Sequence, residues 1–271
     1  MSPRQAGFPP AEKFFPPRRT LPALARAVQD CRACPLYKHA TQAVFGEGER
    51  DAQLVMVGEV PGDQEDLQGH VFVGAAGKML DRCLAEVGLP REDLWLTNAV
   101  KHFKFEPRGK RRIHKKPTTT EVQACFPWLE IELEKVHPEM IVCLGATAIR
   151  AVLGPKVAVM RDHGKVFSSE WAPWVMPTYH PSALLRAPDE ERDATRQTFL
   201  ADLRIAARRY GEISSSTGTK RDAHDTRGMR AQPEGRAEGE PRRRGAGGRL
   251  GRPRSQPGGD HGTRHGTRGA R

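Results

Sequence analysis

The chain has 271 residues and a formal net charge of +11. This length allows one large domain or two small ones, with a core of useful size. No apolar run reaches the length that spans a membrane, so we expect a cytoplasmic protein with no membrane partner. The excess of positive charge predicts a polyanionic partner, although part of it lies in the Arg-rich C-terminal end.

The two ends of the chain are expected to lie outside the folded domain. Residues 1–20 contain proline pairs that forbid a regular helix, and they lack the apolar run of a signal peptide. Residues 211–271 have almost no aliphatic side chains, so burial cannot offset the entropy of ordering them. We therefore predict a flexible N-terminal segment, a domain over residues 21–210 and a disordered basic tail rich in Gly and Arg.

Strands and helices alternate along the predicted domain. Aliphatic runs predict strands at 52–59, 94–100, 139–145 and 174–180. Apolar residues at helical spacing predict helices at 21–31, 75–89, 118–136, 146–153 and 190–210. The third helix begins with a capping box and either continues past Pro127 or breaks there. This alternation predicts an α/β fold with right-handed crossovers and a mostly parallel sheet covered on both faces.

Polar residues close three of the predicted strands. Glu59 ends the first strand, Asn98 lies near the end of the second, and His180 ends the fourth. In parallel sheets of this kind, binding sites form beyond the carboxyl ends of the strands. We therefore expect Glu59, Asn98 and His180 to lie in one crevice, together with the loop "GEVPGDQED" at 58–66.

Four of the five cysteines suggest a metal site. Cys31 and Cys34 form a CxxC pair, and Cys125 and Cys143 lie far downstream. A helix precedes the CxxC pair, which argues against a thioredoxin-like motif, and four thiolates suit zinc and an iron–sulfur cluster equally. The alternative is that Cys125 and Cys143 are small buried hydrophobic residues, which is the interpretation we favour for Cys83.

The segment "GKRRIHKK", residues 109–116, surrounds a histidine with cations. His114 lies among five basic residues, Lys110, Arg111, Arg112, Lys115 and Lys116. The segment shows neither helical nor strand periodicity, so we expect a loop. Neighbouring cations disfavour protonation and should lower the imidazole pKa. Such dense charge indicates an anionic ligand, and the simplest interpretation is a phosphate clamp with an incidental histidine.

Several motifs, in this order, resemble the iron–sulfur uracil-DNA glycosylases known as family 4. After the CxxC pair come "GEVPGDQED", "FVG" with "AGKMLD", "LTNAVKHFKF", "ACFPWL", "LGATA" and "HPSALLR". The presence of "KRRIH" resembles the UdgX-type branch in particular, and the similarity covers about residues 31–209. The resemblance implies a three-layer α/β/α sandwich with a four-stranded, mainly parallel sheet. It also implies a 4Fe-4S cluster on Cys31, Cys34, Cys125 and Cys143.

The resemblance implies roles for five residues in releasing uracil from DNA. Phe72 would stack on the flipped base, Asn98 would read its N3 and O4, and His180 would donate to O2 as charge develops there. In the UdgX type, His114 would attack C1′ with Glu59 fixing its tautomer, which leaves protein and abasic DNA covalently joined after one turnover. Without the resemblance, ordinary structural roles such as core packing for Phe72 are the better interpretation.

Further positions follow from the same resemblance. Gly62 and Asp63 would let the backbone approach the base. The predicted phosphate-binding residues are Lys110, Arg111, Arg112 and Ser182. The partner would be uracil-containing DNA, single-stranded as well as duplex, bound by a monomer. One position departs from the UdgX pattern, because Val60 stands where Gln usually follows the motif Glu, and any contact through a Gln side chain would be lost.

Three functions remain open from the sequence. The first is a glycosylase that ends covalently bound to DNA through His114. The second keeps the same site but uses water as the nucleophile and releases its product. The third is a non-catalytic iron–sulfur protein that binds nucleic acid. A zinc protein would be colourless, whereas a protein with an iron–sulfur cluster would be brown.

Overall fold

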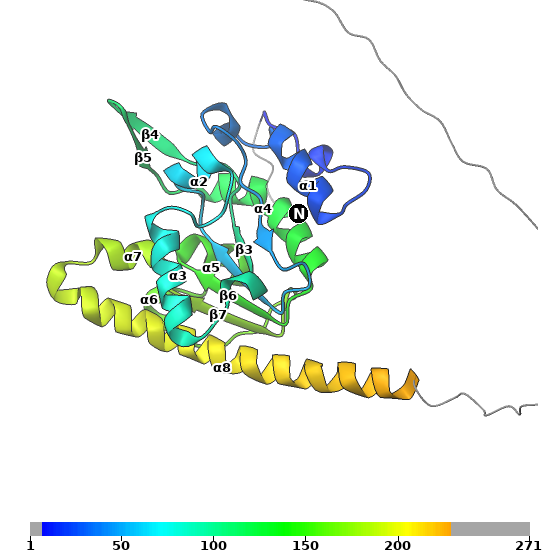
Figure 1. The fold of residues 1–271 in the computed structure, drawn as a ribbon. Coiled ribbons are helices and arrows are strands. Elements are labelled where there is room, and N and C mark those ends of the chain that lie inside the picture. The colour runs from blue at the N-terminus through cyan, green and yellow to red at the C-terminus, as the bar shows by residue number, and fades with distance from the viewer. Residues whose placement is uncertain (1–6, 229–271) are drawn as a thin grey trace, which may run out of the picture. The chain divides into compact units, whose positions relative to one another are not determined.

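A five-stranded sheet forms the centre of the protein (Figure 1). The computed structural model describes residues 7–228, with side chains as far as residue 215. The strand order is β1-β3-β2-β6-β7. These strands are β1 (Glu47–Gly48), β2 (Leu54–Gly58), β3 (Trp95–Asn98), β6 (Met140–Leu144) and β7 (Trp174–Thr178). β3, β2, β6 and β7 pair in parallel, whereas the short edge strand β1 is antiparallel to β3. The predicted four parallel strands are confirmed, with β1 as an addition.

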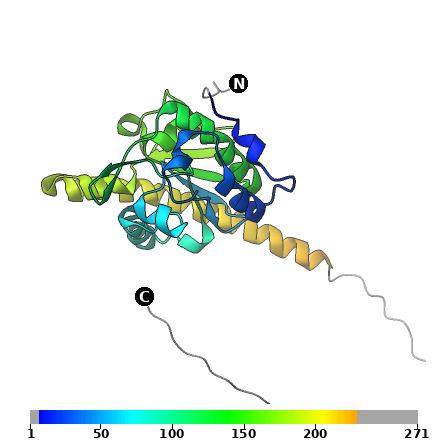
Figure 2. The same cartoon turned by 90° about the horizontal axis from the view of Figure 1, so that it is seen from above.

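Helices cover both faces of this sheet. Along β2, Val55 and Val57 point into one hydrophobic cluster, whereas Leu54 and Met56 point into the other. The first cluster includes α1 (Leu21–Ala27), α4 (Thr119–Val136) and α5 (Ala146–Leu153), and the second includes α3 (Ala75–Val87), α7 (Pro181–Arg186) and α8 (Asp189–Gly228). Figures 1 and 2 show α8, in yellow to orange, along one side of the sheet. The predicted α/β/α sandwich is therefore confirmed.

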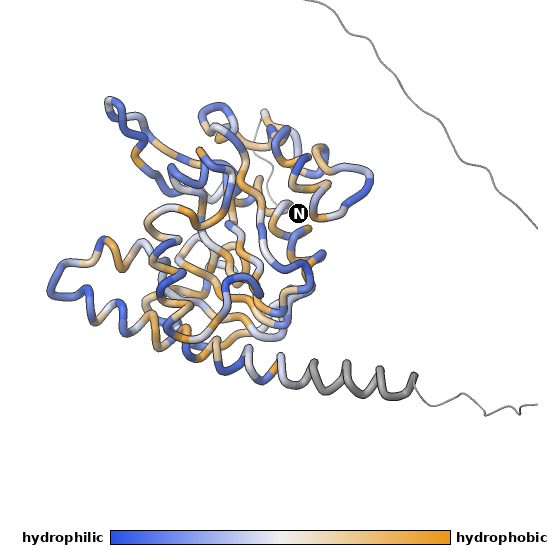
Figure 3. Tube along the Cα trace, in the orientation of Figure 1, coloured by the Kyte–Doolittle hydropathy of each residue, from blue (hydrophilic) through white to orange (hydrophobic). Residues whose placement is uncertain are grey.

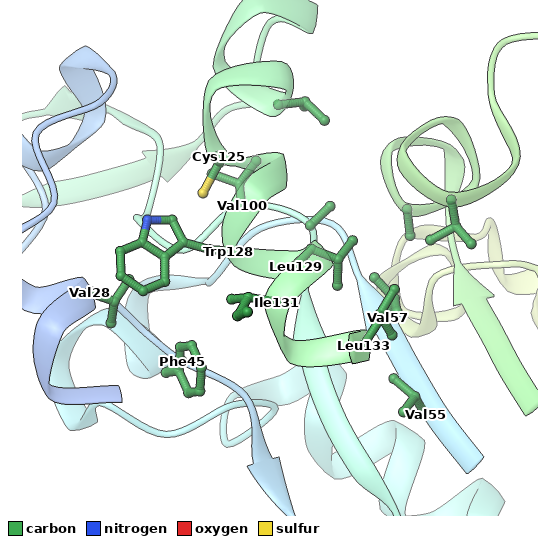
Figure 4. Close-up of a cluster of buried hydrophobic side chains, with 14 of the residues drawn as sticks. Val28, Phe45, Val55, Val57, Val100, Cys125, Trp128, Leu129, Ile131 and Leu133 are labelled. Carbon is green, nitrogen blue, oxygen red and sulfur yellow. The ribbon is translucent and has the colours of Figure 1, made fainter. Parts of the chain in front are cut away.

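Helix α4 carries much of the first cluster. It begins with the predicted capping box between Thr118 and Glu121, and it continues through Pro127 to Val136. Trp128 is fully buried at its centre. Figure 4 shows Trp128 and Leu129 of this helix among Val28, Phe45, Val55, Val57, Val100 and Leu133, with Cys125 on the same helix. The helix thus fixes Cys125 beside the segment that follows β3.

The segment around His114 is a hairpin rather than the expected loop. β4 (Phe105–Arg108) pairs with β5 (Arg111–His114), and Gly109 has the φ of 60° that suits the first position of a type II′ turn. Most of the hairpin is exposed on both faces, so the alternation that marks a half-buried strand is missing from its sequence. Figure 3 shows its hydrophilic tip in blue. The pairing places Arg112 and His114 on one face.

Both ends of the predicted domain extend further than expected. A 3-10 helix, η1 (Ala11–Phe14), lies in the segment expected to be flexible. The ring of Phe15 packs edge-on against Trp128 with centroids 4.6 Å apart, so apolar burial holds this segment. At the other end, α8 continues to Gly228 and buries Ile213, so this helix extends beyond the predicted domain boundary at residue 210. The rest of the predicted tail lies outside the described residues.

Five short helices complete the described part. Three of them are 3-10 helices, η2 (Val28–Asp30), η3 (Pro35–Lys38) and η4 (Arg91–Asp93). The other two are the α-helices α2 (Asp63–Gln68) and α6 (Val159–Asp162). Helix α2 replaces part of the loop expected after the first strand, and it lies beside the hairpin in Figure 1.

Candidate active site

A cavity of about 680 Å³ lies beyond the carboxyl ends of the parallel strands. It brings together the predicted residues Glu59, Gly62, Asp63, Phe72, Asn98, His114, His180 and Ser182. Val60, Glu65, Lys116 and Arg186 also line it. Residues from five separate stretches of the chain therefore meet in one place, as the crossover topology predicts. An α/β sandwich with titratable side chains in such a cavity has the arrangement of an enzyme active site.

Phe72 and Asn98 form one wall of the cavity. Both are nearly fully buried, with Asn98 3% exposed at the end of β3. Gly58 at the end of β2 makes room for them, because a Cβ atom there would lie 2.3 Å from Asn98 Oδ1 and 2.7 Å from Phe72 Cζ. The result is an aromatic ring next to a side-chain amide, which suits a flat ligand with hydrogen-bonding edges.

His180 is held in one tautomer by the start of α7. Its Nδ1 accepts a hydrogen bond from the backbone N–H of Ser182 at 3.1 Å and also lies 2.8 Å from Ser182 Oγ. Because Nδ1 accepts, the neutral ring carries its proton on Nε2. The ring lies nearly parallel to that of Phe72, with centroids 6.2 Å apart. The Ser182 amide is thus used within the site, and its predicted contact with phosphate stays a prediction.

The pKa of His180 is lowered to about 4. Burial is the main cause, Glu59 opposes it, and Arg186 and His114 contribute smaller lowering effects.

Glu59 is oriented by α5 rather than by His114. Its Oε1 accepts a hydrogen bond from the backbone N–H of Thr147 at 2.8 Å. Gly145 leaves space for it, since a Cβ there would lie 2.8 Å from that same oxygen. No hydrogen bond joins Glu59 to His114 in the described part of the chain, contrary to our expectation. The carboxylate is nevertheless close enough to raise the pKa of His114.

The pKa of His114 is lowered from its ordinary value, but not chiefly by the hairpin cations. Desolvation by the surrounding side chains is the largest cause, followed among the lowering effects by Arg186 and Lys116. Glu59 and Glu65 act in the opposite direction. The lowered pKa favours the expected neutral imidazole, with partial desolvation at the cavity rather than local charge as the main cause, although His114 as a whole residue is exposed. The ring lies 5.9 Å from that of Phe103.

Arg112 does not face solvent as a phosphate ligand would. Its Nε donates to Asp63 Oδ1 at 2.7 Å, and its Nη1 donates to Asp66, whose side chain is 0% exposed. The guanidinium also lies over the rings of Phe103 and Phe105, at 5.3 and 5.2 Å. These contacts fasten the hairpin to α2, so the guanidinium of Arg112 already has carboxylate partners, and its predicted contact with phosphate stays a prediction. The carboxylate of Asp63 binds Arg112, and the predicted backbone role of Asp63 likewise stays a prediction.

The remaining hairpin cations are free or weakly held. Lys110 and Arg111 are exposed at the turn, and neither makes an ion pair with another described residue. Lys115 pairs with Glu106 at 2.7 Å, and both side chains are largely exposed. Such surface pairs contribute little energy, so these cations remain available to an anion.

Three of the four predicted metal ligands, Cys31, Cys34 and Cys125, lie near enough to one another to affect each other's pKa. The sulfur of Cys31 accepts from Trp128 Nε1 at 3.2 Å, and that of Cys125 accepts from the Lys101 backbone N–H at 3.2 Å. The pKa of Cys34 is raised to about 11, chiefly by burial and to a smaller extent by Cys31. The pKa of Cys125 is raised by burial and then by Cys34 and Cys31. N–H donors around sulfurs are typical of the shell around a metal centre.

Cys143 is separate from the other three. It lies within β6, fully buried between Val57 of β2 and Pro177 of β7, and its pKa is raised by burial alone. Its predicted role as a ligand is therefore not supported by its position in the sheet. In residues 7–228, no three or more His, Cys, Asp or Glu residues gather closely enough to hold a single metal ion.

His102 is a buried histidine that the sequence analysis missed. It is 4% exposed and follows Lys101, the residue that donates to Cys125. Its pKa is lowered to about 4, first by burial and then by Arg32, which lies between Cys31 and Cys34. An imidazole is thus present beside the CxxC pair. Its only signal in the sequence is its place in "NAVKHFKF".

Comparisons with known proteins identify the family. The family model described as "Uracil DNA glycosylase superfamily" matches residues 45–204. A Type-4 uracil-DNA glycosylase of Thermotoga maritima is 39% identical over 184 residues, which cover 68% of this chain and 91% of that protein. A Type-4 uracil-DNA glycosylase of Archaeoglobus fulgidus is 40% identical over 176 residues, with coverages of 62% and 85%.

The chain therefore belongs to the uracil DNA glycosylase superfamily, and the prediction of a glycosylase enzyme is confirmed. A Type-5 uracil-DNA glycosylase of Pyrobaculum aerophilum is more distant, at 32% identity over 173 residues that cover 55% of this chain and 72% of that protein. Among the described helices, none combines the length and apolar character needed to cross a membrane.

The low pKa values of the two active-site histidines lead to a first prediction. Arg186 lowers the pKa of both His114 and His180, so Arg186→Gln should raise both pKa values toward 6.5. NMR titration of the histidine side chains measures this directly. Lys110→Gln removes an exposed charge of the same sign and should leave both values unchanged. Equal shifts in the two variants would show that Arg186 has no specific effect.

Proposed function

We propose that this protein excises uracil from DNA as a UdgX-type glycosylase and becomes covalently joined through His114 to C1′ of the abasic site. The observation that carries the proposal is the shared cavity, in which neutral His114 lies with Asn98, Phe72 and a neutral His180. The substrate is uracil-containing DNA, single-stranded as well as duplex. We further propose that the protein acts as a monomer in the cytoplasm.

The wall formed by Phe72 and Asn98 supports recognition of a flipped uracil. The aromatic face of Phe72 stacks on the extruded base, as in other enzymes that act on bases outside the helix. The Asn98 amide accepts from N3–H and donates to O4, whereas cytosine presents the reverse pattern. Val60 is buried in the same cavity and has no polar group for the base, so Asn98 provides the polar discrimination.

His180 supports departure of the base. Breaking the C1′–N1 bond leaves the electron pair on uracil, spread over N1 and O2. The Nε2–H of His180 donates to O2, and this bond strengthens as negative charge develops there. A neutral donor suits this role, because it needs no proton from solvent and is already fixed by Ser182.

His114 then captures the sugar. A lone pair on its neutral ring nitrogen forms the new bond to C1′ of the oxocarbenium ion, and the ring N–H proton is released afterwards. The carboxylate of Glu59, oriented by Thr147, stabilises the cationic sugar. Lys110 and Arg111 at the exposed hairpin turn bind the phosphates on either side, while Arg112 keeps the hairpin against α2.

We also propose that the protein holds an iron–sulfur cluster, with a ligand set different from the one first expected. The hydrogen-bonded sulfurs of Cys31 and Cys125, with Cys34 nearby, suit thiolate ligands, and His102 is the proposed fourth ligand in place of Cys143. Imidazole replaces thiolate in known iron–sulfur centres. When bound, such a group would brace the CxxC segment against the residues that follow β3.

Denaturing gel electrophoresis after incubation with uracil-containing single-stranded DNA tests the covalent step. The wild-type protein should give a heat-stable shifted band, and His114→Ser should lose the band while still releasing uracil. The missing hydrogen bond between Glu59 and His114 favours the competing route, in which water attacks. Free abasic product from the wild-type protein, with no shifted band, would support that route and reject the covalent one.

Iron analysis and the visible spectrum test the proposed ligand set. Cys125→Ala and His102→Ala should each lose the brown colour and most of the iron, because each removes a ligand. Cys143→Ala removes a buried strand residue of similar size and should keep both. Loss of iron from Cys143→Ala alone would restore the ligand set first predicted from the sequence.

A further inference from the structure

Lys101 is buried, although lysine side chains usually lie at the surface of proteins. Its side chain is 0% exposed. Its Nζ donates to Thr97 Oγ1 at 2.7 Å and to the Asn98 carbonyl at 2.8 Å. It also pairs with Glu132 Oε1 at 3.0 Å. All three ammonium N–H groups are therefore used inside the protein.

Glu132 is equally enclosed. Its side chain on α4 is 0% exposed, and it accepts from the Gly46 backbone N–H at 3.1 Å and from the Thr97 hydroxyl. A buried ion pair costs desolvation energy, and replacing both partners with apolar residues is often neutral for stability. A gain in stability therefore does not explain the ion pair between Lys101 and Glu132. The hydrogen bond from Lys101 to the Asn98 carbonyl instead indicates that the pair positions Asn98.

The segment from Asn98 to Lys101 connects the active site with the cysteines. The Val100 backbone N–H donates to the Glu59 carbonyl at 3.2 Å, which continues the pairing of β3 with β2. The Lys101 backbone N–H donates to Cys125 Sγ at 3.2 Å. This short stretch thus contains Asn98 and contacts both Glu59 and Cys125. The ammonium of Lys101 donates to the Asn98 carbonyl and so connects the two ends of the stretch.

We propose that Lys101 is a positioning residue for uracil recognition. Its ammonium, held by Glu132, fixes the Asn98 peptide so that the Asn98 amide faces the base. The ion pair between Lys101 and Glu132 also connects Lys101 to α4, the helix that carries Cys125. This inference rests on the proposed function, since it assigns Lys101 an effect only through the contact between Asn98 and uracil.

The test compares two lysine variants under single-turnover conditions, with uracil release measured at saturating protein. Lys101→Met keeps the chain length and removes the three hydrogen bonds, and the rate should fall on the order of tenfold. Lys104→Met is the matched control, because Lys104 pairs with Glu121 at 2.8 Å and makes no contact with Asn98 in the described structure. Its rate should stay within about twofold of wild type.

Two further variants separate position from stability. The double variant Lys101→Met/Glu132→Met removes the unpaired carboxylate, so it should recover the melting temperature and iron content while uracil release stays slow. In an Asn98→Ala background, adding Lys101→Met should lower the rate of uracil release by less than a further factor of about two, because Lys101 acts through Asn98. A tenfold further loss there, or a wild-type rate in the double variant, would overturn the inference.

The two proposals fail in different ways. If the wild-type protein releases uracil and Lys101→Met releases it equally fast, the inference is wrong and the proposed function stands. If the wild-type protein releases no uracil under any tested condition, the proposed function is wrong and the inference falls with it.

Discussion

The ion pair between Arg112 and Asp66 determines where the proposed nucleophile lies. A two-stranded hairpin has too little buried surface to hold its own position, and this one is mostly exposed. Arg112 reaches from the hairpin to α2, where Asp66 is buried and also accepts hydrogen bonds from the Thr41 backbone and hydroxyl at 2.9 and 2.6 Å. Because Arg112 and His114 share a face, this contact places His114 at the cavity.

The dense charge around His114 therefore has several separate purposes. Arg112 holds the hairpin against α2, Lys110 and Arg111 are exposed, and Lys116 helps to lower the pKa of His114. Partial desolvation lowers that pKa more than the nearby cations do. Exposed cations on the hairpin and a histidine of lowered pKa at the cavity are the combination that the proposed capture of a cationic sugar requires.

The strands and helices of the core could be predicted because continuous aliphatic runs and helical spacing mark fully buried elements. The same reasoning placed Glu59, Asn98 and His180 together, since parallel strands end at one edge of the sheet. This reasoning failed where tertiary contacts determine whether a side chain is buried and what it contacts. Lys101 is buried against the usual preference of lysine for solvent, and only the fold brings Glu132 to it. Spacing alone likewise did not separate Cys143, a strand residue, from the other cysteines.

The most direct test of this account measures two products of the same reaction in Asp66→Asn. Loss of the charged partner should loosen the hairpin, so the fraction of reacted DNA that is covalently joined to protein should fall while uracil release continues. Glu106→Gln, which removes the partner of the exposed Lys115, serves as the control and should keep the wild-type fraction. An unchanged covalent fraction in Asp66→Asn would contradict the claim that this ion pair positions His114.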